Sequence, residues 1–132
     1  MMIKLLTLLG MLYLHIVDDY YLQGFLASAK QKEWWVKNYP DDLYKHDYII
    51  ALIEHGFSWT VTIMSIPAIS LLYRNITDWN HTLLFIVVFL VNWFMHCGVD
   101  HLKVNKKYIN LVTDQMMHFC QVYITWFIFI MM

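Results

Sequence analysis

The stretch from Thr82 to Lys103, TLLFIVVFLVNWFMHCGVDHLK, is the part of the chain that decides the fold. Its first part, TLLFIVVFLVNWF, is almost wholly apolar, which a small soluble helical bundle rarely tolerates and which is typical of a helix that crosses a membrane. The stretch then ends with two histidines, an aspartate and a lysine. Ionisable side chains at the end of an apolar helix indicate a functional site.

The composition of the whole chain also indicates a membrane protein. Its 132 residues suit one domain, and we expect a single integral membrane domain over residues 1–132. Apolar residues make up 60% of the chain and charged residues only 14%, against about 25% in an ordinary soluble domain. The net charge of -1 argues against nucleic acid as a partner. Cys97 and Cys120 lie in apolar runs, so we expect reduced packing residues.

Four apolar runs predict an all-α fold, namely a four-transmembrane-helix bundle. The predicted helices cover residues 3–27, 48–73, 80–101 and 108–131. A bilayer core is crossed by roughly 17–25 helical residues. A signal peptide is the alternative for the first run, with Ala27-Ser28-Ala29 as its cleavage site. Because Asp18 and Asp19 separate the apolar run from that site, we favour a helix that is retained.

The distribution of lysine and arginine predicts the orientation of the bundle. The loops at 30–47 and 102–107 together hold seven lysines, whereas the opposite side holds only Lys4 and Arg74. Cytoplasmic loops of membrane proteins are enriched in these residues. We therefore expect both loops on the cytoplasmic side of the cytoplasmic (inner) membrane, with both termini on the outer side.

Every predicted helix brings a histidine or carboxylate to one depth, close to the cytoplasmic interface. Residues four apart share a helix face, and such pairs are His15 with Asp19, His96 with Asp100, and Asp114 with His118. In the second helix Glu54 and His55 are adjacent and cannot both face inward, so we favour His55. A charged group inside a membrane helix costs about 2.5–3.5 kcal/mol on insertion scales, so these side chains should face the bundle interior.

A polar layer of this kind predicts a metal site, because helix bundles build such sites from histidines and carboxylates on facing helices. The candidate metal ligands are His15, Asp19, His55, His96, Asp100, Asp114 and His118, and Gln23, Asn92 and Gln115 are candidates to orient them. Imidazole and carboxylate ligands favour Zn, Mn or Fe over Mg. A proton relay or a structural hydrogen-bond network is the alternative. Asp18, His101, Lys106 and Lys107 are expected to be solvated.

Three motifs of the chain resemble a known family. HIVDDYYLQ has the form H-x3-D-x3-Q, HCGVDHLK the form H-x3-D-x2-K, and DQMMH the form D-Q-x2-H. Together with His55 they resemble the small bacterial and phage membrane proteins of domain-of-unknown-function family 3307, which is similar to the YdjM-like membrane-bound metal-dependent hydrolases. The resemblance implies a divalent metal and a hydrolytic reaction. The family often has two histidines in its second helix, whereas this chain has only His55 there.

Two classes of function follow from the sequence. The first is a membrane-embedded metal-dependent hydrolase at the inner-leaflet interface, acting on a lipid or amphipathic phosphate or ester. Its catalytic residues would be Asp19, His96, Asp100 and Lys103, with the lysine receiving an anionic group of the substrate. The second is a non-enzymatic membrane effector, bacterial or phage-encoded, that binds a host membrane protein or a second copy of itself. Its His/Asp layer would then be structural.

Overall fold

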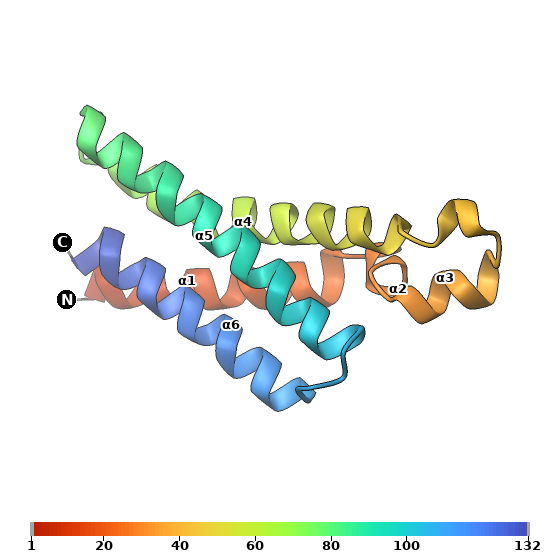
Figure 1. Cartoon of the computed structure of the whole chain (residues 1–132). Helices are drawn as coiled ribbons and strands as arrows, with labels where there is room; N and C mark the ends of the chain where they lie inside the picture. Colours follow the sequence, from red (N-terminus) through yellow and green to blue (C-terminus); the bar gives the residue numbers. More distant parts are fainter. Residues whose placement is uncertain (1, 132) are drawn as a thin grey trace.

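The structure is a computed structural model that describes residues 2–131, and it confirms the all-α class. Within that part of the chain six α-helices pack together (Figure 1). They are α1 (Met2–Val17), α2 (Leu26–Ala29), α3 (Lys32–Asn38), α4 (Asp47–Tyr73), α5 (Trp79–Val104) and α6 (Leu111–Trp126). Two π-helical turns, Asp18–Leu22 and Phe127–Met131, extend α1 and α6, and a 3-10 turn at Asp42–Tyr44 precedes α4.

The four long helices form a closed ring of contacts. α1 packs against α4 and α6, and α5 packs against the same two helices. The two termini lie together at one end of this bundle, and α3 lies at the opposite end (Figure 1). An apolar core fills the terminal end of the bundle, and its fully buried members include Met11, Trp59, Ile63 and Val122.

Side-chain caps define where two of the long helices begin. The Asp78 side chain accepts hydrogen bonds from the backbone N–H groups of Asn80 and His81 at the start of α5. The hydrogen bond from the His81 backbone contributes most to lowering the pKa of Asp78. Asn110 accepts from the Thr113 N–H in the same way at the start of α6. These caps place polar residues in the loops and leave the apolar runs inside the helices.

The first helix is shorter than the segment over residues 3–27 that the sequence predicts. Its hydrogen bonds widen into a π-turn over Asp18–Leu22, and Gly24 then adopts a positive φ of 47° that ends the helix. The π-turn buries both adjacent aspartates, with Asp18 1% and Asp19 4% exposed. The expectation that Asp18 is solvated is therefore wrong.

Two segments of the described residues are long and apolar enough to cross a membrane. They are Asp42–Tyr73, which contains α4, and α5. This finding rests on length and composition, and buried core helices of soluble proteins pass the same test. Cys97 and Cys120 are free thiols, as the sequence predicts.

Candidate metal centre

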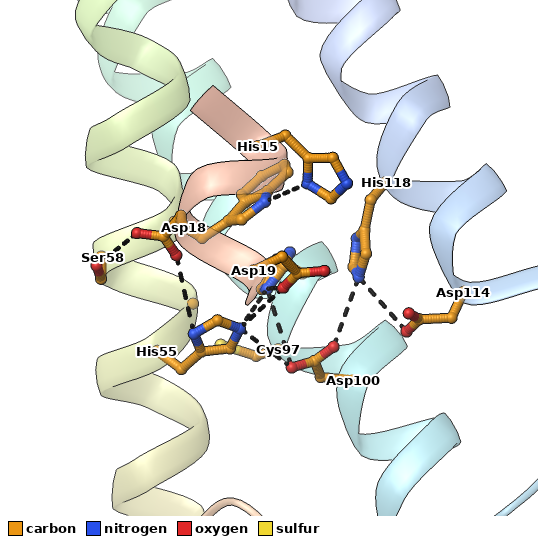
Figure 2. Close-up of polar contacts among 12 residues, drawn as sticks. His15, Asp18, Asp19, His55, Ser58, Cys97, Asp100, Asp114 and His118 are labelled. Carbon is orange, nitrogen blue, oxygen red and sulfur yellow. Dashed lines mark hydrogen bonds and ion pairs between the residues drawn. The ribbon is translucent and has the colours of Figure 1, made fainter. Parts of the chain in front are cut away.

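Six buried side chains from all four long-helix segments lie close together in the interior of the bundle (Figure 2). Asp19 comes from the π-turn after α1, His55 from α4, His96 and Asp100 from α5, and Asp114 and His118 from α6. They form three overlapping groups, in each of which three ligand atoms lie within 4.8 Å of one another. We call these six residues the His/Asp centre. The prediction of a buried histidine and carboxylate cluster is confirmed.

Three atoms of the centre lie close to His55 Nε2. His55 Nε2 lies 3.1 Å from His96 Nε2, 3.3 Å from Asp19 Oδ1 and 3.4 Å from Asp100 Oδ2. His96 Nε2 lies 3.9 Å from each of the two carboxylate oxygens. Ligands about 2.0–2.2 Å from a tetrahedral zinc ion are roughly 3.3–3.5 Å apart. The spacing therefore fits ligands that share one ion.

Asp100 connects this group of atoms to a second one. Its Oδ1 lies 3.5 Å from His118 Nε2, and that nitrogen lies 3.5 Å from Asp114 Oδ1 (Figure 2). None of these three atoms has a hydrogen-bond partner among residues 2–131. Buried polar atoms in folded proteins usually have hydrogen-bond partners. Three unpaired atoms at one place therefore indicate that another chemical group binds there.

Two lysines form ion pairs with carboxylates of the centre. Lys30 Nζ lies 2.5 Å from Asp100 Oδ2, and both side chains are almost fully buried. Lys103 Nζ lies 2.5 Å from Asp114 Oδ2, and its side chain is 23% exposed. The sequence analysis missed Lys30, because a lysine at the start of a polar loop has no pattern that marks it as buried. It reaches the centre because the chain turns at Gly24 and α2 then packs against α4.

Gln115 hydrogen-bonds residues of the centre directly, and His15 contacts Gln115. His15 Nδ1 accepts a hydrogen bond of 2.8 Å from Trp59 Nε1, and His15 Nε2 lies 3.1 Å from Gln115 Oε1. Gln115 in turn donates to Asp19 Oδ2 at 2.8 Å. Both ring nitrogens of His15 are thus occupied by protein groups, and His15 belongs to none of the three ligand groups. This geometry fits a residue that positions Gln115 and Asp19.

Asp18 and Trp59 also support the histidines, and the sequence analysis assigned neither to the site. Asp18 Oδ2 lies 3.9 Å from His55 Nδ1, and Asp18 Oδ1 accepts from Ser58 Oγ at 2.8 Å. The Trp59 ring stacks on His96 with centroids 4.2 Å apart. Contacts of this kind fix the orientation of metal-binding imidazoles. The i,i+4 relation of His55 and Trp59 on α4 is a sequence feature that could have found Trp59.

The remaining predicted residues lie further from the centre. Asn92 donates to Thr125 Oγ1 at 2.8 Å, and its carbonyl accepts from Gln121, whose Oε1 lies 3.1 Å from His118 Nδ1. Gln23 follows the π-turn after α1, and its Oε1 is buried without a hydrogen-bond partner among residues 2–131. Glu54 is exposed, whereas His55 is fully buried.

The buried charges of this region do not balance. Four carboxylates (Asp18, Asp19, Asp100 and Asp114) face two ammonium groups (Lys30 and Lys103), which leaves two negative charges if the histidines are neutral. Uncompensated charge in a protein interior is strongly unfavourable. The excess of negative charge favours the binding of cations.

Comparison of the chain with protein-family models, curated proteins and solved structures finds no match. The resemblance drawn from the three motifs stays a prediction, and the function has to be inferred from the centre itself.

Proposed function

We propose that this protein is a membrane-embedded, metal-dependent hydrolase and that the His/Asp centre holds its metal ion. The observation that carries the proposal is the approach of His55 Nε2 to His96 Nε2, 3.1 Å apart, with an oxygen of Asp19 and one of Asp100 within 3.9 Å of both. Two imidazole nitrogens and two carboxylate oxygens around one point form a ligand set for a divalent ion. The mixture of ligands favours Zn, Mn or Fe over Mg.

Different residues of the chain would hold the metal ion, orient its ligands and bind the substrate. His55, His96, Asp19 and Asp100 hold the ion, which when bound acidifies a water molecule and polarises an acyl or phosphoryl oxygen. Gln115 fixes the Asp19 carboxylate, and Lys30 fixes that of Asp100. Lys103 has the most exposed side chain of the charged groups that touch the centre, at 23%. It is placed to receive an anionic group of the substrate.

The outer surface of the bundle supports a membrane location with four spans. Large apolar side chains are exposed on all four long helices, for example Leu5 on α1, Phe57 on α4, Phe94 on α5 and Ile124 on α6. The interior, by contrast, buries aspartates, histidines and lysines. An apolar surface around a polar interior is the arrangement expected of a protein in the hydrocarbon core of a membrane. With the lysine-rich loops at the cytoplasmic side, the centre lies near the inner leaflet, where a lipid or amphipathic phosphate or ester is the matching substrate.

Metal content of the detergent-purified protein tests the proposal. We would compare wild type, the double variant His96→Ala/Asp100→Ala, and His81→Ala, which removes a histidine of α5 outside the centre. Each protein would be loaded with Zn or Mn, desalted and measured by elemental analysis, with circular dichroism as the check of helix content. Wild type and His81→Ala should retain metal and the folded double variant should lose it, after which lipid phosphates and esters are screened as substrates.

A wild-type protein that stays metal-free after loading with either ion overturns the proposal. The alternative, a non-enzymatic membrane effector with a structural polar layer, predicts that result and also predicts that the double variant loses its helical fold.

A further inference from the structure

The atoms of Asp100 do not converge on a single ion. Asp100 Oδ2 faces His55 and His96, whereas Asp100 Oδ1 faces His118 on the neighbouring helix α6. A carboxylate whose two oxygens face different histidines has the orientation of a bridging ligand. The region around His118 is therefore a separate position, next to the one on which the proposed function rests.

The hydrogen bonds around His118 leave a lone pair at this second position. Gln121 donates from Nε2 to the carbonyl of Asn92 at 3.2 Å, which directs its Oε1 toward His118 Nδ1, 3.1 Å away. Because an amide oxygen accepts, His118 Nδ1 carries a proton, and Nε2 is an acceptor when the ring is neutral, as it is in a metal-bound imidazole. This assignment follows from the hydrogen-bond network.

His118 Nε2 thus faces two further acceptors. Asp100 Oδ1 and Asp114 Oδ1 each lie 3.5 Å from it, and all three atoms are buried without a hydrogen-bond partner among the described residues. Three acceptor atoms that face one another in a protein interior repel unless a cation or a proton lies between them. An oxygen of Asp19 also lies within 4.8 Å of a ring nitrogen of His118 and of an oxygen of Asp114.

We propose that the centre binds two metal ions, bridged by Asp100. This inference rests on the proposed function. The first position is formed by His55, His96, Asp19 and Asp100 Oδ2, and the second by His118, Asp114 and Asp100 Oδ1. Asp19 shares one group of close ligand atoms with His55 and His96, and another with Asp114 and His118. Lys103 pairs at 2.5 Å with Asp114 Oδ2, which leaves Asp114 Oδ1 facing His118. Lys30 pairs at 2.5 Å with Asp100 Oδ2, the oxygen that also faces His55 and His96. Two-metal sites with ions about 3.5–4 Å apart are common in hydrolytic enzymes.

Manganese titration followed by electron paramagnetic resonance is the test, because neighbouring Mn(II) ions couple magnetically and a single ion does not. Wild-type protein should bind two ions per chain, and the coupled spectrum should appear as the second ion binds. His118→Ala should bind one ion and give the spectrum of isolated Mn(II). His81→Ala is the control, because it removes a histidine of α5 that belongs to neither position. It should keep two ions and the coupling.

The outcomes separate this inference from the proposed function. One ion per chain in wild type, unchanged in His118→Ala, overturns the second position and leaves the first intact; His118 would then be a protonated imidazolium that donates to the two aspartates. No bound ion in wild type overturns both. The wild-type titration alone decides the matter if His118→Ala does not fold.

Discussion

The two ends of the bundle share the same four helices but have opposite interiors. Toward the termini the core consists of apolar side chains such as Met11, Ile63 and Val122, which are fully buried. At the other end the equally buried interior consists of the His/Asp centre and Lys30. Trp59 lies at the boundary, since it belongs to the apolar core and stacks on His96. Burial of apolar side chains stabilises the end near the termini, whereas the charged side chains at the other end require partners of opposite charge.

This difference distinguishes the residues that stabilise the fold from the residues that form the metal site. A side chain in the apolar end can be shortened at the cost of packing alone. A charged side chain in the polar end cannot be removed without leaving its partner uncompensated. Stability and metal content should therefore respond differently to substitutions at the two ends.

The largest loss of stability is expected from Lys30→Met. It leaves Asp100 without its ammonium partner, and breaking a buried ion pair from one side costs about 3–5 kcal/mol of unfolding free energy. The measurement is a denaturant titration in detergent with chelator present, so that metal does not contribute. The double variant Lys30→Met/Asp100→Leu removes both charges and should recover much of the loss.

Lys107→Met is the matched control for that experiment. Lys107 pairs with Glu33 at 2.5 Å as well, but both side chains are more than half exposed, so the effect should be small. Equal destabilisation by Lys30→Met and Lys107→Met would contradict the buried character of the Lys30 pair.

At the apolar end, Ile63→Ala should reduce stability by about 2–5 kcal/mol and leave the metal content unchanged. Ile63 is fully buried in the core, whereas Ile69 on the same helix is 65% exposed. Ile69→Ala is therefore the control and should change stability little. Loss of metal in a folded Ile63→Ala protein would show that the two ends are coupled, against the division drawn above.

The sequence predicted the long helices and the polar layer because both depend on local periodicity. Apolar runs identify helices such as α5, and pairs four residues apart, such as His96 and Asp100, share a face in any α-helix. Neither the interruption of the first helix nor the burial of Asp18 and Lys30 follows from such a pattern. They depend on a π-turn, on the positive φ of Gly24 and on how α2 packs, which are tertiary properties.

The sequence alone also does not determine which of the candidate residues are the metal ligands. His15 shares the i,i+4 spacing of the other pairs, and spacing alone makes it a ligand candidate. Its ring nitrogens instead face Trp59 and Gln115, which lie on two other helices. Which histidine binds and which one supports depends on these contacts between helices.

A smaller loss of stability is expected from a substitution at Gly56, where α4 and α5 pack closely at the polar end of the bundle. A methyl group at Gly56, next to His55, would overlap Cys97 Sγ and lie 3.3 Å from Trp93 Cδ1, both on α5. Gly56→Ala should push α4 and α5 apart, reduce stability by about 1–3 kcal/mol and weaken metal affinity, because the two helices carry His55 and His96.

Gly98→Ala is the control for Gly56→Ala, because a methyl group at Gly98 has no neighbouring atom within 4 Å. Alanine favours helix over glycine by roughly 1 kcal/mol, so this variant should be as stable as wild type or more so. Stability is measured by thermal melting and affinity by metal titration. If Gly56→Ala bound metal as tightly as Gly98→Ala, the spacing of α4 and α5 would not control the centre.

The smallest effect is expected at the start of α6, where Asn110 caps the helix that carries Asp114 and His118. Asn110 Oδ1 accepts from the Thr113 N–H at 2.9 Å, and Asn110→Ala should cost about 1 kcal/mol. Because fraying would begin one turn before Asp114, the second metal position should weaken while the first, on α4 and α5, stays unchanged. Asn110→Asp restores a capping side chain and should behave as wild type. Equal weakening of both positions in Asn110→Ala would mean that the two positions form one inseparable site, because α6 contributes ligands to the second position only.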